Sequence, residues 1–249
     1  MALSHVGGPM ESWTKAQASP VTEVDIKLDT YLNGALRTAR PAYGWLSEES
    51  PDDLSRLTAR RSFVVDPIDG TRGFMKGEDS WTVTAAVIEN GVALAGVVYA
   101  PVRDELIEAA AGGGVSVNGV RLDPPQRGLT ARPRIAGPPV VHEALVAAVF
   151  PYQRVQGTVS LAYRLTLVAR GLAEVALVRP GAEDWDIAGA MAILTEMGIE
   201  PSDACTGALQ LNGPTTRHGP LAVCADPLLK ARLVGVLRDV YPCPDAITT

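Results

Sequence analysis

The alternation of apolar and polar positions divides the chain into a helix, a run of strands, and a later region where helices and strands alternate. Between residues 20 and 39, Val24 and Leu28 belong to a series with helical spacing. A turn at residues 89–91 is expected to join two apolar, β-branched strands. Another strand is expected to stop at Asp66-Pro67, because proline cannot continue a sheet ladder. The expected strands cover residues 62–65, 81–88, 92–99, 103–110 and 115–122, the last with a turn at 118–119.

The pattern changes in a stretch rich in proline, glycine and arginine at residues 124–139. We predict a domain boundary there, with an α+β half at residues 1–124 and an α/β half at residues 125–249. Alternating elements of this kind favour helices layered on a sheet. Beyond the boundary, helices are expected at residues 143–150, 161–170, 187–197 and 228–240, and strands at residues 173–178 and 221–224.

The composition is that of a globular protein: 249 residues, 47% of them hydrophobic and 20% charged. A net charge of −6 argues against a general nucleic-acid binder, but it allows a small anionic partner where a metal supplies positive charge. No uncharged apolar run approaches the ~20 residues of a membrane span, and residues 1–13 lack the pattern of a secretion signal. We therefore expect a cytoplasmic monomer or homodimer with no membrane partner and no nucleic-acid partner.

Several common kinds of site are missing from the sequence. The three cysteines, Cys205, Cys224 and Cys243, are odd in number and form no C-x-x-C motif, so we expect no disulfide framework and a reducing compartment. There is no G-x-S-x-G motif, no Walker loop and no G-x-G-x-x-G after a strand, and the three histidines are scattered. Serine hydrolases, P-loop enzymes, nicotinamide enzymes and histidine–zinc enzymes are all disfavoured.

Candidate chemistry centres on Asp66-Pro67-Ile68-Asp69-Gly70-Thr71, where two carboxylates three residues apart can converge on one point. Oxygen ligands of this kind suit Mg²⁺ or Mn²⁺ rather than zinc. Gly70 allows the backbone to approach a ligand closely, and nearby N–H groups could face an anion. An ordinary surface turn is the alternative, because Asp, Pro and Gly are common turn residues.

Three further acids lie in other segments, and each has a simpler alternative role. Glu48 belongs to the Glu48-Glu49 pair, which could be a solvated acidic loop. Asp25 follows Thr22 at the start of the first helix, where it could act only as a cap. Asp186 opens a later helix, and capping there is compatible with metal binding.

Taken together, the motifs S-P-V-T-E-x-D, S-E-E-S, V-D-P-I-D-G-T and E-D-W-D-I-A-G-A resemble the inositol monophosphatase-like superfamily of metal-dependent, lithium-sensitive phosphatases. The resemblance runs from about residue 19 to the C-terminus. It implies a mixed α/β (α+β) fold layered as an α/β/α/β/α sandwich, with the site between the two halves. It also implies two or three Mg²⁺ ions, for which Mn²⁺ can substitute, and a small phosphorylated metabolite as substrate.

The resemblance also implies roles for individual residues. The proposed metal ligands are the carboxylates of Glu48, Asp66, Asp69 and Asp186 and the backbone carbonyl of Ile68. Most of these come from the first half, and Asp186 comes from the second. Glu48, Asp25 and Thr71 are implied to be catalytic, acting on the attacking water, and Gly70 and Thr71 to cradle the phosphate.

The substrate implied is a nucleoside bisphosphate, because residues 96–102 and 160–171 look more like bacterial 3′(2′),5′-bisphosphate nucleotidases than inositol phosphatases. Arg164 lies where those enzymes tend to have lysine, and its guanidinium would suit a second phosphate; alternatively it is a surface helix residue. Arg72 and Lys76 are weaker candidates for anion contacts. We expect hydrolysis of adenosine 3′,5′-bisphosphate to AMP and phosphate.

Two alternatives remain open. One is an inositol monophosphatase or another sugar or polyol phosphatase, such as one for histidinol phosphate. The other is a metal- or phosphate-binding protein without catalysis. It is suggested by the start of the chain, where only 18 residues precede Ser19 and members of the superfamily usually have a longer helix.

Overall fold

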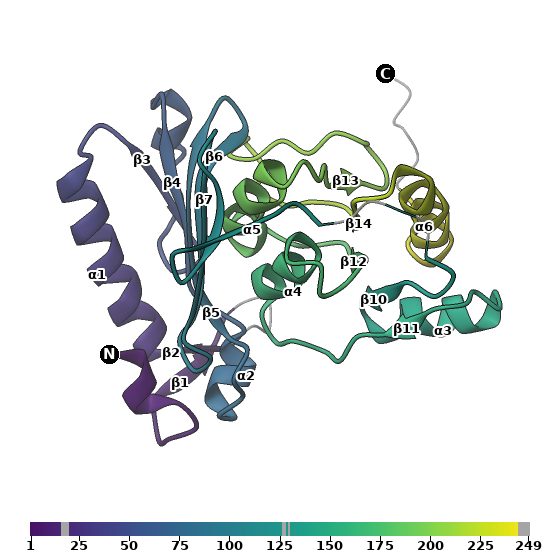
Figure 1. Cartoon of the computed structure of the whole chain (residues 1–249). Coiled ribbons are helices and arrows are strands. Elements are labelled where there is room, and N and C mark those ends of the chain that lie inside the picture. Colours follow the sequence, from purple (N-terminus) through teal and green to yellow (C-terminus); the bar gives the residue numbers. More distant parts are fainter. Residues whose placement is uncertain (16–19, 126–127, 129, 244–249) are drawn as a thin grey trace.

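The computed structural model describes residues 1–15, 20–125, 128 and 130–243. Ser19, in the first motif, therefore lies outside the described residues. Helices and sheets alternate in layers (Figure 1): α1, a seven-stranded sheet, α4 with α5, a five-stranded sheet, and α3 with α6. The expected α/β/α/β/α order of layers is confirmed. The helices are α1 (Glu23–Ala39), α3 (Pro139–Ala147), α4 (Leu161–Ala169), α5 (Asp184–Glu196) and α6 (Pro227–Val240).

The seven-stranded sheet has the order β3-β4-β5-β6-β7-β8-β9 and is antiparallel except for the β3–β4 pair. The expected run 115–122 forms two strands, β8 and β9, joined at the predicted turn, where Asn118 and Gly119 have φ of 50° and 76°. Asn-Gly turns with two left-handed residues match the twist of adjoining strands. The strands are β3 (Gly44–Ser47), β4 (Ser62–Asp69), β5 (Thr82–Glu89), β6 (Val92–Ala100), β7 (Glu105–Ala110), β8 (Gly114–Val117) and β9 (Val120–Leu122).

Strand β4 does not stop at Asp66, and the expectation that it would is wrong. It runs on through Pro67 to Asp69, with a β-bulge against β5 between Asp66 and Asp69. Proline is tolerated because the parallel neighbour β3 pairs only as far as Val65, so no partner strand on that side requires the missing N–H. The bulge places both aspartates at the same end of the strand.

The five-stranded sheet has the order β11-β10-β12-β14-β13. Its strand β10 lies inside the stretch 124–139, where the sequence indicated only an interruption, and residues 126, 127 and 129 of that stretch lie outside the described residues. The division of the chain into two halves, at residues 1–124 and 125–249, stays a prediction. The strands are β10 (Arg134–Ala136), β11 (Gln153–Arg154), β12 (Val175–Val178), β13 (Ser202–Asp203) and β14 (Leu221–Cys224).

Helix α5 lies between the two sheets and forms the centre of the main core. Its residues Ile187, Ile193 and Leu194 are fully buried, together with Leu165 of the neighbouring α4. On the opposite face of the large sheet, α1 begins with a capping box between Thr22 and Asp25. The shorter elements are η1 (Ala2–His5), β1 (Ser12–Thr14), β2 (Pro20–Thr22), η2 (Ser55–Thr58) and α2 (Thr71–Met75).

The expectation of no disulfide is wrong, because Cys205 and Cys243 are bonded, with Cα atoms 5.5 Å apart. They are separated by 38 residues, and the fold brings the end of α6 beside the loop after β13. An odd number of cysteines excludes complete pairing only, and here Cys224 is the free, buried one. The argument for a reducing compartment therefore loses its basis. Among the described residues, no helix is long and apolar enough to cross a membrane.

Candidate metal centre and active site

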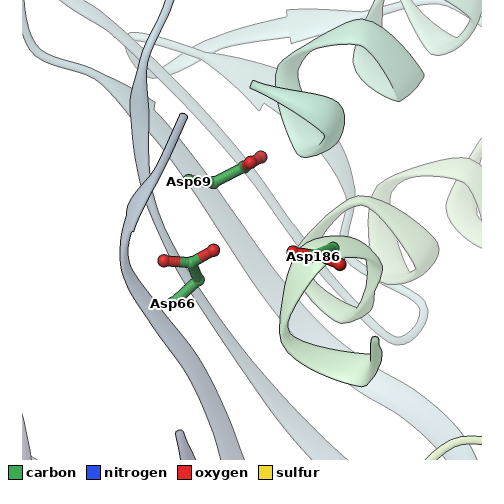
Figure 2. Close-up of side chains that lie close together, drawn as sticks. All are labelled: Asp66, Asp69 and Asp186. Atoms are coloured by element: carbon green, nitrogen blue, oxygen red, sulfur yellow. The ribbon is translucent and has the colours of Figure 1, made fainter. Parts of the chain in front are cut away.

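Three aspartates predicted as metal ligands lie together where the two sheets face each other through α5 (Figure 2). Asp66 and Asp69 come from the bulged end of β4, and Asp186 comes from the first turn of α5. One carboxylate oxygen from each residue lies within 4.8 Å of the others. The bulge in β4 is therefore what directs two acids of one strand at the helix opposite.

Hydrogen bonds fix each carboxylate through one oxygen. The backbone N–H of Ile68 donates to Asp66 Oδ1 at 2.9 Å. Asp69 Oδ2 accepts from the Ser160 hydroxyl at 2.6 Å and from the N–H of Ala162 at 2.7 Å. Asp186 Oδ2 accepts from the N–H of Glu183 at 2.7 Å, which closes a capping box of α5. Capping and metal binding are thus compatible in Asp186, since its other oxygen is left for a ligand.

The cluster is electrostatically costly without a cation. Burial raises the pKa of Asp66 well above its usual range, and Glu48 and Asp69 raise it further. Burial also raises the pKa of Asp69 to about 6, against the hydrogen bonds that lower it. The pKa of Asp186 is raised by burial and by the charge of Asp69. Like charges in a low-dielectric site disfavour ionisation until a cation neutralises them.

One atom in this cluster fits a metal particularly well. Asp66 Oδ2 is buried and has no hydrogen-bond partner. A buried, unpaired carboxylate oxygen is expensive, and oxygen-only donor sets suit Mg²⁺ or Mn²⁺. The donor chemistry therefore fits the divalent cation that the sequence implied.

Glu48 follows β3 and lines the same cavity as the aspartates. Its Oε1 accepts from Lys15 Nζ at 3.0 Å, and Glu49 Oε2 lies 2.7 Å from the same nitrogen. Burial raises the pKa of Glu49 to about 7, although Lys15 opposes the shift. Burial lowers the pKa of Lys15, but the two glutamates outweigh that effect and leave it raised. Sequence reasoning missed Lys15, whose only signal is its place just before the first motif.

Asp25 and Thr71 are hydrogen-bonded to each other, although Asp25 precedes β4 in the chain and Thr71 follows it. Thr71 Oγ1 lies 3.1 Å from Asp25 Oδ1 and 3.1 Å from the carbonyl oxygen of Ile68. The N–H of Thr22 donates to Asp25 Oδ2 at 2.8 Å, so this carboxylate does cap α1. Burial raises the pKa of Asp25. Asp25 therefore caps α1 and also contacts Thr71, and its catalytic role stays a prediction.

Gly70 joins β4 to α2 with a φ of 98°. A Cβ atom there would lie 3.1 Å from Val159 and 3.2 Å from the nitrogen of Ser160, so neither the space nor the backbone conformation suits another residue. The cavity beside this turn has a volume of about 840 Å³. It is lined by Glu48, the three aspartates, Gly70 and Thr71, and also by Arg72, Lys76, Arg179 and Arg217.

Arg164 lines a second cavity of about 820 Å³, which shares Asp69, Asp186 and Arg179 with the first. Its Nη2 donates to the carbonyl of Thr158 at 3.1 Å. Burial lowers the pKa of Arg164, Asp69 raises it, and the charge of Arg179 lowers it. Arg154 lines this cavity too. Arg154, Arg164 and Arg179 have no ion pair with any acid among the described residues.

Sequence reasoning predicted Arg164 but missed Arg154 and Arg179. Arg179 directly follows buried strand β12 and comes shortly before Asp186, and this position is the only signal that could have identified it. Arg154 belongs to the two-residue strand β11, which no pattern in the sequence predicted.

Comparison with known proteins gives a consistent family assignment. The sequence model of the inositol monophosphatase family matches residues 4–240. Over 105 residues the chain is 43% identical to the 3′(2′),5′-bisphosphate nucleotidase CysQ of Escherichia coli, covering 42% of this chain and 43% of that protein. The alignment therefore spans less than half the length of the nucleotidase.

Other similarities extend over most of the chain. A histidinol-phosphatase of Mycobacterium tuberculosis is 30% identical over 229 residues, covering 87% of this chain and 84% of that protein. The crystal structure of an IMPase/NADP phosphatase complexed with Mg²⁺ and phosphate superimposes with a TM-score of 0.80 at 19% identity, covering 94% of this chain and 88% of that one. At that identity the superposition supports the shared fold alone.

Proposed function

Because the chain belongs to the inositol monophosphatase family, we propose that it is a Mg²⁺-dependent phosphomonoesterase that hydrolyses adenosine 3′,5′-bisphosphate to AMP and phosphate. The observation that carries this proposal is the pairing of two cavities. A cavity lined by carboxylates adjoins a cavity lined by arginines, and they share Asp69 and Asp186. A substrate with one phosphate to be cleaved and a second phosphate to be held would use both.

The proposed metal ligands are Glu48, Asp66, Asp69, Asp186 and the carbonyl of Ile68, which would hold two Mg²⁺ ions, with a third nearer Glu48 and Asp25. When bound, such ions polarise the phosphoryl group and neutralise charge on the leaving oxygen. The unpaired Oδ2 of Asp66 supports this assignment, because it is a buried carboxylate oxygen with no other partner. The related IMPase/NADP phosphatase structure contains Mg²⁺ and phosphate, which agrees with the same chemistry.

The chain's own groups would position the attacking water. Thr71 Oγ1 can donate its proton to Asp25 Oδ1, which leaves an oxygen lone pair to accept a hydrogen bond from water. The carboxylate of Glu48, held by Lys15, would accept the proton that the water loses. Backbone N–H groups at Gly70 and Thr71 would hold the phosphate oxygens, as expected at a tight turn into a helix.

A smaller phosphate ester is the second candidate, because the similarity to a histidinol-phosphatase covers 87% of the chain. An ester of histidinol or inositol carries one phosphate and would leave the arginines of the second cavity without an anion. That difference makes the two candidates separable by kinetics.

The test is phosphate release by the purified full-length chain in Mg²⁺. Adenosine 3′,5′-bisphosphate, inositol 1-phosphate and histidinol phosphate are compared by kcat/KM, each with an EDTA control. We expect the highest kcat/KM for the bisphosphate and no release in EDTA. A preference for either monophosphate contradicts the substrate assignment but keeps the reaction class. Mg²⁺ binding without release from any of the three contradicts the enzymatic proposal.

Arg164→Met tests the second phosphate directly. A hydrogen-bonded charge pair contributes about 1.5–3 kcal/mol, so KM for the bisphosphate should rise roughly 10- to 100-fold with kcat little changed. The matched control is Arg37→Met, on the exposed side of α1 across the large sheet. An equal rise in KM for inositol 1-phosphate would mean that Arg164 acts on the first phosphate or on the fold.

A further inference from the structure

The second cavity has a wall contributed by the C-terminal segment. Tyr241, directly after α6, lines this cavity together with Arg164 and Arg179. Its ring packs against the core formed by α3, α6 and the small sheet. Burial raises the pKa of Tyr241, while the charge of Arg179, which lines the same cavity, lowers it. The ring therefore packs on an apolar core and also borders the cavity that the arginines line.

Three bonds hold this segment in place. The N–H of Tyr241 donates to the carbonyl of Leu237 at 2.7 Å, which ends α6. Arg238 Nε donates to the carbonyl of Ala204 at 2.5 Å. Two residues after Tyr241, Cys243 is bonded to Cys205 in the same loop as Ala204. Tyr241 therefore lies between two attachments to one loop, and its backbone has little freedom to leave the cavity.

The rest of the cavity combines apolar surface with charged groups. Its apolar lining includes Pro138, Val140 and Leu161. Its basic lining is Arg154, Arg164 and Arg179, and its acidic lining is Glu143 together with Asp69 and Asp186, the two acids that it shares with the carboxylate cluster. Rings of tyrosine and planes of arginine both stack on nucleobases, and arginine also pairs with phosphate. A polyol offers neither a flat face nor a second anion. The lining therefore suits a ligand that is aromatic at one part and anionic at another.

We propose that Tyr241, held by the Cys205–Cys243 disulfide, is a specificity-determining residue that contacts the base of a nucleoside bisphosphate. This inference rests on the proposed function in one respect only, since it requires a bisphosphate substrate. It adds the contact that distinguishes a nucleotide from a sugar bisphosphate. Tyr241 has no part in the phosphate chemistry, so its loss should act on KM and not on kcat.

The experiment compares adenosine 3′,5′-bisphosphate with its abasic analogue, 1-deoxyribofuranose 3,5-bisphosphate, which keeps the 2-hydroxyl group, in the wild-type protein, Tyr241→Ala and Tyr241→Phe. One base–aromatic contact is worth about tenfold in binding. Tyr241→Ala should raise KM about tenfold for the nucleotide and leave KM for the abasic analogue unchanged, while Tyr241→Phe stays near wild type. Tyr31→Ala, an exposed tyrosine on α1, is the matched control.

The outcomes separate this inference from the proposed function. A wild-type protein that hydrolyses neither bisphosphate in Mg²⁺ overturns the proposed function, and the base contact with it. A wild-type protein that hydrolyses both with the same KM overturns the base contact alone. Equal changes in KM for both compounds in Tyr241→Ala also overturn it, because they would indicate a general disturbance of the cavity.

The disulfide is tested with Cys205→Ser and Cys243→Ser. Both variants should raise KM for the nucleotide to the same extent, and Tyr241→Ala combined with Cys243→Ser should add little, because the changes act through one contact. Circular dichroism checks that both variants remain folded. A wild-type KM in both serine variants overturns the role of the disulfide, and full additivity overturns its action through Tyr241.

Discussion

The carboxylate cluster and the arginine-lined cavity adjoin each other but are built in opposite ways. Asp66 and Asp69 are buried, and each is fixed by hydrogen bonds from backbone N–H groups or a short hydroxyl side chain. Arg154 and Arg179 are exposed, and each extends from the end of a strand in the small sheet. The first region holds several like charges in a rigid frame, whereas the second combines two exposed arginines with the half-buried Arg164.

The difference suggests a division of labour. A rigid, buried cluster holds a cation in one geometry, as positioning of a reacting phosphoryl group requires. Flexible arginines at an open cavity bind an anion with less exact geometry and attract it over a distance. We therefore expect changes in the cluster to affect kcat and changes in the cavity to affect KM.

The largest effect is expected from Asp66→Asn. Loss of this buried carboxylate oxygen, which has no hydrogen-bond partner, should remove at least about 4 kcal/mol of transition-state stabilisation, or about a 1000-fold loss of kcat/KM. Without metal, the variant should be as stable as wild type or more stable, because one of several like charges is gone. Phosphate release and urea unfolding in EDTA measure the two effects.

Asp79→Asn is the control for this substitution, since Asp79 is an exposed acid paired with Arg103. It should leave both activity and stability close to wild type. If Asp66→Asn kept near-normal activity, the carboxylate cluster could not be the centre of the reaction. If the substitution unfolded the protein in EDTA, the carboxylate of Asp66 would be needed for folding and would not destabilise the metal-free protein.

An intermediate effect is expected on stability without metal, as a function of pH. The pKa of Asp69 is about 6 in the folded protein and about 3.9 in an unfolded chain, so the folded state binds this proton more tightly. The contribution of Asp69 to stability therefore falls as pH rises from about 4 to about 6, and stays low above that. The difference in unfolding free energy between Asp69→Asn and wild type in EDTA should grow by roughly 1–3 kcal/mol over this interval.

Taking the difference between the two proteins removes the contribution of groups whose pKa does not depend on Asp69. His142 has a pKa lowered by burial, so its own contribution rises with pH and would partly hide the effect in wild type alone. Saturating Mg²⁺ should abolish the difference in slope, because the cation compensates the ionised carboxylates. If the difference in unfolding free energy did not change with pH in EDTA, the pKa of Asp69 would be the same in the folded and the unfolded protein.

The sequence predicts the cluster far better than the cavity, and the reason is physical. Asp66 and Asp69 lie in one short motif whose local residue types already suggested an oxygen-ligand site. Asp186 was identified through the resemblance of the combined motifs to a family, because cap chemistry alone left it an ordinary helix cap. The main helices and the antiparallel strands were predicted from periodicity within each segment. What the sequence could not indicate was the bulge that lets β4 continue through Pro67, because that depends on where β3 ends.

The cavity depends instead on contacts between distant segments. Arg154 lies in β11, Arg164 in α4 and Arg179 directly after β12. The patterns that predicted α4 and β12 do not indicate that these arginines line one cavity. Tyr241 lines the same cavity, close in the chain to the Cys205–Cys243 disulfide. The odd number of cysteines had argued against that disulfide. No spacing rule within a segment predicts which side chains meet when α3, α4 and α6 surround one end of the small sheet. Lys15, which pairs with Glu48 and Glu49, was missed for the same reason.

The smallest effect is expected from a change in salt concentration, which tests the comparison between the carboxylate cluster and the arginine-lined cavity. Raising ionic strength from about 0.05 M to about 0.5 M shortens the screening length to a few ångströms, which weakens exposed charges much more than buried ones. At saturating Mg²⁺, KM for adenosine 3′,5′-bisphosphate should rise several-fold while kcat stays constant, and KM for inositol 1-phosphate should rise less. Arg164→Met should reduce the salt dependence for the bisphosphate. Equal salt dependence for the two substrates would mean that the arginine-lined cavity does not attract the second phosphate, and that the metal cluster alone supplies the binding energy.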